Sequence, residues 1–312
     1  MAKKFWRNRA ILCGIETTYG LLAVLTGAAN AMLMSNVSFE PLLGNDLSRD
    51  LVQPYMGHQG IILDGNYGRL QGDIEIAGAG VAGDIPAYGV MLRSCGLQEV
   101  IDAGVDVQYS PVSGSFEASS ILFNNDGIQQ LLLGVRGTFT MSLTPGQIPR
   151  FSFTMTGLLG ELTDTDLPVV DLTKFITPVP VNKANTTFSL HGLSATAAAV
   201  EGITFDIANQ IEPRMLIGSE SIEQVDRQMT GSIIMEQVTL STKNWIQTAR
   251  THAKGVLAAQ QGTVAGNIVM FGAEGVQIGR PTWGETQRIN NNTLPVMMTP
   301  LAGNDEFLIT VK

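Results

Sequence analysis

Short segments of alternating apolar and polar residues recur along most of the chain. Residues 69–76 alternate with a period of two, and residues 105–109, 138–143 and 151–155 repeat this pattern. A period of two is typical of a strand with one buried face and one exposed face. Turn residues separate these segments, most clearly at 124–127, where Asn-Asn-Asp-Gly tolerates positive φ angles and favours a hairpin. We therefore predict a β-rich fold.

Helical signals are confined to two short segments. Residues 87–94 and residues 243–254 are each predicted to form a helix that ends at a following glycine. Residues 41–68 contain two prolines and five glycines and show no clear period. We predict a long loop with one short hairpin there.

The pattern of the first half returns in the second half. Residues 203–206 mirror residues 37–40, and residues 228–235 mirror residues 69–76. The recurrence indicates an internal duplication of one β-rich domain, although two unrelated β domains can share such patterning by chance. Two similar domains in one chain favour a ring with half as many chains as its apparent symmetry. The expected parts are an N-terminal arm (1–35), a first β domain (36–163), a connector (164–200), a second β domain (201–300) and a C-terminal segment (301–312).

The composition adds two constraints. Charged residues make up 15% of the 312 residues, against about 25% in typical soluble domains. This low fraction suggests that an oligomer covers much of the surface. The net charge of −9 is spread over both halves and argues against a protein that grips nucleic acid through its phosphates, which requires clustered Lys and Arg.

The candidate chemistry is sparse. Cys13 and Cys95 are too few for a disulfide framework, and the three histidines form no metal-binding pattern. Residues 78–83 match G-x-G-x-x-G, but the strand before them carries Asp73 and Glu75, whereas a dinucleotide-binding strand reads continuously apolar. We interpret the glycine run as a turn, and we expect no enzyme activity, no catalytic residue, no cofactor and no metal site.

The N-terminus imitates a secretory signal without completing it. Basic residues precede the apolar stretches at 10–13 and 21–25, but Glu16, Thr17 and Thr18 interrupt the apolar run. No stretch reaches the roughly 18 apolar residues of a membrane helix, so we expect no membrane partner. A cleaved signal would favour an exported β-sandwich adhesin or binding protein, and this alternative stays open.

Several segments resemble the major tail tube proteins of long-tailed, siphovirus-type bacteriophages. The likeness lies in residues 15–20, 70–78, 86–96, 109–113, 134–138, 145–149, 205–214 and 226–232. The resemblance implies tail-tube-type β-sandwich or barrel domains, each flanked by a short helix, whose six-fold rings enclose a barrel-like lumen. Together with the duplication, this predicts trimeric rings of pseudo-six-fold symmetry, with a hexamer as the alternative.

The resemblance also implies a structural role in the virion tail, after assembly in the bacterial cytoplasm. The chain would stack in rings as the conduit for DNA and would meet tape measure, tail terminator and baseplate proteins. Ring stacking would use residues 1–35, 41–68 and 301–312. Asp73, Glu75 and Glu236 are the candidate lumen-facing residues, because inward carboxylates would repel DNA; a solvated strand face is the alternative. Another tail component with the same domain, a terminator or a baseplate hub, also stays open.

Overall fold

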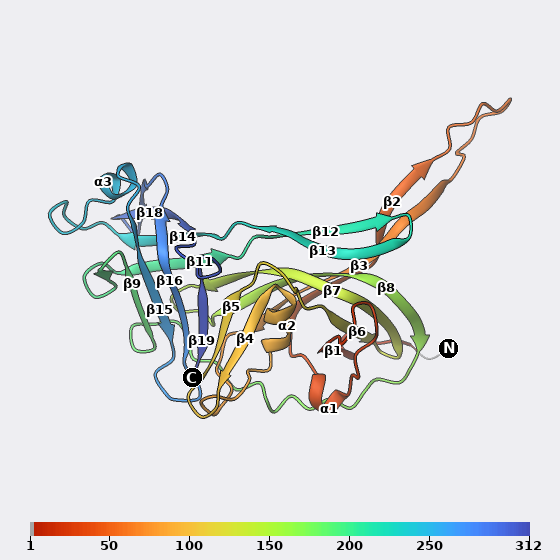
Figure 1. Ribbon diagram of the computed structural model, residues 1–312, viewed down its shortest axis with the longest axis horizontal. Helices are drawn as coiled ribbons and strands as arrows, with labels where there is room; N and C mark the ends of the chain where they lie inside the picture. The colour runs from red at the N-terminus through yellow and green to blue at the C-terminus, as the bar shows by residue number, and fades with distance from the viewer. Residues whose placement is uncertain (1–2) are drawn as a thin grey trace.

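Strands dominate residues 3–312, the part of the chain that the computed structural model describes (Figure 1). The first half contributes β1 (Arg9–Ile15), α1 (Gly27–Asn30), β2 (Ser35–Ser48), β3 (Ile61–Glu75), α2 (Gly89–Ser94), β4 (Leu97–Asp102), β5 (Asp106–Pro111), β6 (Ser119–Asn125), β7 (Ile128–Leu143) and β8 (Arg150–Asp164). The helices are short, and all strand pairings are antiparallel among these residues. The prediction of an all-β fold with minor helices is confirmed.

The second half follows an irregular segment, since β8 ends at Asp164 and the next strand begins at Thr186. Its elements are β9 (Thr186–Leu190), β10 (Leu193–Ser194), β11 (Val200–Asp206), β12 (Asn209–Leu216), β13 (Ser219–Arg227), β14 (Thr230–Glu236), α3 (Trp245–Arg250), β15 (Lys254–Gln261), β16 (Val269–Ile278), β17 (Thr282–Thr286), β18 (Ile289–Met298) and β19 (Leu308–Val311). The segment predicted as a connector, 164–200, therefore includes two short strands near its end.

One large sheet of 17 strands spans both halves, while β12 and β13 form a separate two-stranded ribbon. In the first half the pairing order is β2-β3-β8-β7-β6-β1. In the second half it is β11-β14-β18-β16-β15-β9. The strand β11 also pairs with β7, which joins the two orders into one sheet.

A single hydrophobic core runs through both halves. The rings of Phe151 and Phe271 meet across the boundary between the halves at a centroid separation of 6.3 Å, and within the second half Phe307 lies 6.4 Å from Phe271 and 6.0 Å from Phe205. Aromatic pairs at such distances stabilise a core beyond the area that they bury. The two halves therefore pack as one body.

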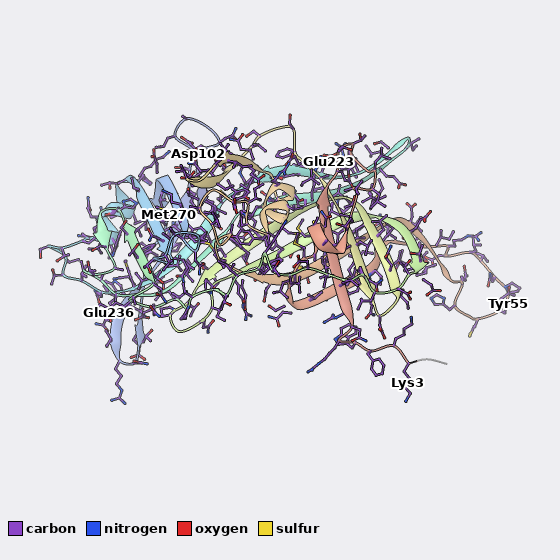
Figure 2. All side chains as sticks on the ribbon, turned by 90° about the horizontal axis from the view of Figure 1, so that it is seen from below. Lys3, Tyr55, Asp102, Glu223, Glu236 and Met270 are labelled. Atoms are coloured by element: carbon purple, nitrogen blue, oxygen red, sulfur yellow. The ribbon has the colours of Figure 1, made fainter. Side chains whose placement is uncertain are left out.

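Residues 41–68 contain the hairpin that the sequence predicted, but this hairpin is longer than expected and leaves only residues 49–60 outside its strands. The strands β2 and β3 continue through most of this segment and pair as a hairpin that projects from the body (Figures 1 and 2). Breaks in the register beside Pro41 and Gly44 accommodate these residues as bulges. Both faces of the distal hairpin are exposed, so it has no buried face to produce an alternating pattern. We call residues 41–68 the long arm.

The two main helices are shorter than predicted. Helix α2 begins at Gly89 rather than at residue 87. Helix α3 begins after Asn244, whose side chain accepts a hydrogen bond from the Gln247 amide at 2.9 Å. The chain leaves α3 through His252, which has a φ of 53°, and β15 starts at Lys254. The predicted helices exist, but caps and neighbouring strands limit them to six residues each.

The terminal segments are not free extensions along their whole length. The strand β1 pairs with β6, and its Ile11 and Cys13 belong to the core. The strand β19 lies between β16 and β5. Residues 9–15 and 308–311 therefore belong to the body of the molecule, and the use of residues 1–35 and 301–312 in ring stacking stays a prediction.

Candidate functional surface

Eight strands form a continuous surface across both halves, in the order β2-β3-β8-β7-β11-β14-β18-β17. The strand registers place residues in rows that cross both halves. One row consists of Ser35, Asp73, Ser152, Thr140, Asp206, Thr230 and Met297. The next row on the same face consists of Glu75, Arg150, Ser142, Thr204, Ser232 and Pro295. This face, which we call the polar face, is dominated by small hydroxyl side chains.

The opposite face of the same strands is the core. Ile74, Phe151, Met141, Phe205 and Val296 occupy the row between the two polar rows, and each is at most 3% exposed. Because side chains alternate across a strand, burial of this row fixes which residues face away from the core. The polar face is thus set by packing on its reverse side.

The guanidinium group of Arg150 lies between the carboxylates of two predicted lumen residues, Asp73 and Glu75. Arg150 lies 4.0 Å from the Asp73 carboxylate and 3.8 Å from that of Glu75. Asp73 also accepts a hydrogen bond from the Asn36 side chain at 2.7 Å. Glu236 ends β14 on the same face, in the second half, opposite Asn291. The structure brings Asp73 and Glu75 together and keeps Glu236 apart from them.

The sequence reasoning missed Arg150 and the hydroxyl rows. Arg150 lies 75 positions after Glu75 in the chain, and only the pairing of β3 with β8 brings them together. A signal for the hydroxyl rows was present, since Thr138, Thr140 and Ser142 alternate with apolar residues. That alternation predicted a strand, but it did not indicate that polar residues of the neighbouring strands lie beside its own and form a row.

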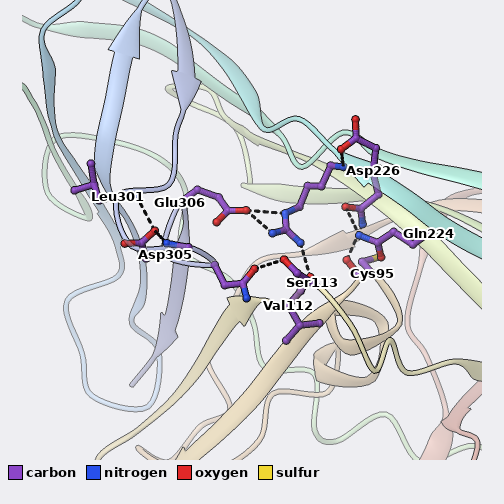
Figure 3. A network of polar contacts seen from close by, with 12 residues as sticks. Cys95, Val112, Ser113, Gln224, Asp226, Leu301, Asp305 and Glu306 are labelled. Carbon is purple, nitrogen blue, oxygen red and sulfur yellow. Dashed lines mark hydrogen bonds and ion pairs between the residues drawn. The ribbon is translucent and has the colours of Figure 1, made fainter.

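A buried polar network fixes the β12–β13 ribbon on the first half (Figure 3). Arg227 donates from Nε to Glu306 Oε1 at 2.8 Å, and a second guanidinium nitrogen also contacts this oxygen. Arg227 Nη1 donates to the Val112 carbonyl at 2.8 Å. The side chains of Arg227 and Glu306 are 10% and 9% exposed. This contact joins the ribbon, the loop after β5 and the segment before β19.

A buried amide reinforces the same attachment. Asn209 donates to the carbonyls of Cys95 at 2.6 Å and Gly137 at 3.0 Å, and accepts from Gln224 Nε2 at 2.9 Å. On the other side of the ribbon, Arg136 pairs with Glu223. Within residues 3–312, Gln224 Oε1 and Glu306 Oε2 have no hydrogen-bond partner, but the bonds that the network makes come from several elements and fix how these elements are arranged. The ribbon is therefore held in a fixed position.

The glycine run 78–83 has a packing role. A Cβ on Gly78 would lie 2.1 Å from the Gly266 carbonyl oxygen, and one on Gly83 would lie 2.2 Å from the Gly104 amide nitrogen. Helix α2 starts only at Gly89 and has six residues, too short and too late to direct an N-terminus at a phosphate. The run allows two backbone segments to approach closely.

The described residues offer little support for other kinds of site. Within residues 3–312, no three His, Cys, Asp or Glu side chains gather as a metal ion requires. The helices described over the same residues are too short for any of them to span a bilayer. Burial raises the pKa of the Cys13 thiol to about 12 and that of Cys95 well above its usual value. Both thiols are accordingly poor nucleophiles.

Comparison with known proteins agrees with a structural role. A family model described as phage tail tube protein matches residues 7–293, which include the ribbon and all of the polar face except Pro295 and Met297. A search of curated proteins found no match. The family is structural and non-enzymatic, and its membership implies self-assembly into a tube in the virion tail. The chain belongs to the phage tail tube protein family.

Proposed function

We propose that this protein forms stacked rings that build the tail tube of a siphovirus-type phage, with the polar face lining the lumen. The observation that carries the proposal is the continuous sheet shared by both halves, polar on one face and buried on the other. A sheet of this kind that continues into further copies encloses a barrel with a polar interior. DNA would pass through this interior during genome delivery.

The proposal includes an internal duplication, with domains at 36–163 and 201–300. The repeated pairing order supports it, since β2-β3-β8-β7-β6-β1 recurs as β11-β14-β18-β16-β15-β9. Each half also carries a short helix after its hairpin, α2 and α3. Three chains would then supply six equivalent domains, whereas a ring of six chains is the alternative.

The lumen lining would resist adhesion of DNA. Asp73, Glu75, Asp206 and Glu236 supply carboxylates to the polar face, and Arg150 lies between the first two. Hydroxyl groups occupy most remaining positions in the central rows. Phosphate binding requires clustered cations, and an isolated arginine engaged by two carboxylates is a weak phosphate ligand. DNA would therefore slide past without being held.

The long arm would contact the adjacent ring. Its tip carries Val52 and Met56, which are 103% and 102% exposed, and Tyr55, which is 69% exposed. Burial of these apolar side chains at the tip by a partner would stabilise the contact. Tape measure, tail terminator and baseplate proteins would be met inside the tube and at its two ends.

Electron microscopy of the purified, concentrated protein tests this function. We expect hollow rings or tubes, with end-on views of six-fold appearance and a mass of three chains per ring. Six chains per ring would retain the tube function and remove the duplication argument. Absence of rings and tubes at every concentration and salt condition would contradict the proposal. The number of copies per virion separates a tube protein, present in many rings, from a terminator or a baseplate hub.

A further inference from the structure

The contact between β7 and β11 is a template for contacts between copies. The strand β7 pairs with β8 along one edge, while its other edge pairs first with β6 and then, over Thr140–Leu143, with β11. In the second half, β16 and β17 take the place of β7, because both pair with β18 and β16 also pairs with β15. Among residues 3–312, however, no strand pairs with the other edge of β17. The strand β2 likewise pairs on one edge only, with β3.

The strand registers identify the equivalent residues. The similarity of residues 69–76 to 228–235 makes Asp73 equivalent to Ser232. Their partners Ser35 and Thr204 are then equivalent. This replaces the match of residues 203–206 to residues 37–40 suggested by the sequence, since the register of β2 on β3 shifts between Ser35 and Ser38. Glu75 is likewise equivalent to Ile234, so their partners Arg150 in β8 and Thr293 in β18 are equivalent. Ser142 lies opposite Arg150 and Thr282 lies opposite Thr293, which makes Ser142 equivalent to Thr282. The pair Ser142–Thr204 inside one chain therefore corresponds to a pair Thr282–Ser35.

The residues next to the Thr282–Ser35 pair, on the core side of the two strands, show which side chains the pairing would bury. Inside one chain, Leu143 lies opposite Ile203, and the two are 1% and 3% exposed. Their equivalents are Trp283 and Met34. Trp283 is 73% exposed, although it lies opposite Asn292, which is 5% exposed and faces the core. A large, exposed aromatic side chain on the core-facing side of a strand with one free edge is a position that a partner normally covers.

A groove lies where the indole ring would enter. It has a volume of about 310 Å³, and its lining includes Leu33, Met34 and Tyr88 with residues 174–178, together with Ser35, Asp73 and Glu75 from the polar face. Leu33 is 47% exposed. The groove adjoins the free edge of β2, and the region of β18 that pairs with β17 lies at the opposite end of the molecule from the long arm (Figure 1). One copy cannot bring its own β17 to its own β2.

We propose that the free edge of β17 in one copy pairs with the free edge of β2 in a second copy, in the register Thr282–Ser35, and that Trp283 enters the groove beside Met34. This inference rests on the proposed function and names its contact surface. The interface is heterologous, so successive copies form a ring if the rotation closes. Each junction between copies reproduces the junction between β7 and β11.

Disulfide trapping tests the register. A variant with both Ser35→Cys and Thr282→Cys is assembled, its assemblies are confirmed by electron microscopy, and it is then mildly oxidised. Directly opposed residues in an antiparallel pair have Cβ separations compatible with a disulfide. We expect a ladder of covalent multimers on a non-reducing gel. The native thiols of Cys13 and Cys95 are 0% exposed and do not compete.

Three controls make the result specific. Ser142→Cys with Thr204→Cys, the template pair, should form a disulfide within one chain and no ladder. Ser35→Cys with Glu285→Cys shifts one partner by three residues, about 10 Å along a strand, and should form no ladder. A mixture of the two single variants, Ser35→Cys and Thr282→Cys, should stop at dimers, because each chain then offers one thiol to the interface.

The outcomes separate this inference from the proposed function. Rings or tubes that form without a ladder, while the template pair becomes oxidised, would overturn the β17–β2 register and leave the tube function intact. Efficient dimerisation of the single variant Ser35→Cys would overturn a heterologous contact. Failure of every variant and of the unmodified chain to form rings or tubes would contradict the proposed function and this inference together.

The proposed contact of the Trp283 indole ring with the groove is tested by a substitution. Trp283→Ser should raise the protein concentration needed for assembly by about tenfold or more, because buried Trp residues dominate interface energies. Trp6→Ser is the matched control, since Trp6 is 68% exposed and lies outside both free edges. Equal assembly of both variants, measured by sedimentation, would overturn the placement of Trp283.

Discussion

The buried ion pair of Arg227 and Glu306 offers a quantitative test of how the ribbon is attached. Replacing Glu306 by Gln removes the negative charge beside the buried guanidinium group, which then has only neutral acceptors in the network, the new amide oxygen and the Val112 carbonyl. Loss of one partner from a buried pair costs about 3–5 kcal/mol, since the other charge stays desolvated. We expect Glu306→Gln to reduce the free energy of unfolding by this amount.

The exposed pair of Arg69 and Glu40 supplies the matched control. Its side chains are 35% and 44% exposed and lie 3.5 Å apart. Solvent screens such a pair, so Glu40→Gln should cost less than about 1 kcal/mol. The two substitutions make the same chemical change and differ chiefly in burial.

Equilibrium denaturation in urea, followed by circular dichroism, measures both losses in free energy. The double variant Arg227→Met with Glu306→Leu should recover most of the stability lost in Glu306→Gln, because apolar groups of similar size remove the unpaired charge. If Glu306→Gln costs no more than Glu40→Gln, the reasoning from burial is refuted. If the double variant is less stable than the single variant, the pair contributes more than the desolvation argument allows.

Three further predictions concern the interior. Cys13 and Cys95 should react with a thiol reagent at neutral pH only at the rate of unfolding, because both are buried; rapid labelling of the folded protein would contradict this. Burial lowers the pKa of His191 below its ordinary 6.5, so the unfolded chain takes up the proton first and stability falls as the pH drops below 6.5. His191→Asn, in which Asn tolerates the φ of 48° at this position, should make the melting temperature less dependent on pH below 6.5. An unchanged dependence would show that His191 is not its source. Gly78→Ala forces a Cβ against a backbone carbonyl and should cost about 1–3 kcal/mol in chemical denaturation, whereas Gly114→Ala, with open space around it, is the neutral control.

The strands that the sequence predicted are those with one buried face. Residues 69–76, 138–143 and 151–155 alternate because their apolar side chains fill the core while the polar ones form the polar face. The full length of the hairpin in the long arm and the strand β17 escaped prediction for the opposite reason. All five residues of β17 are exposed, so neither strand has a buried face to impose a period.

The candidate surface was predictable in part. Asp73 and Glu75 were recognised as polar positions of a half-buried strand, and the structure places them on the polar face. Their partner Arg150 and the row through Thr140 and Asp206 depend on pairings between distant segments. Hydrophobic periodicity describes one strand at a time and contains no information on which strands become neighbours.

The pairing of β7 with β11 inside one chain also has a kinetic consequence for assembly. That junction forms during folding, at an effective concentration set by the polypeptide between the two strands. The proposed junction between β17 and β2 needs a second molecule, so its rate depends on how much protein the cell has made. A duplicated chain would thus complete half of the junctions in a ring before any encounter takes place. Dilute protein would persist as folded single copies, and growth would wait for a threshold concentration.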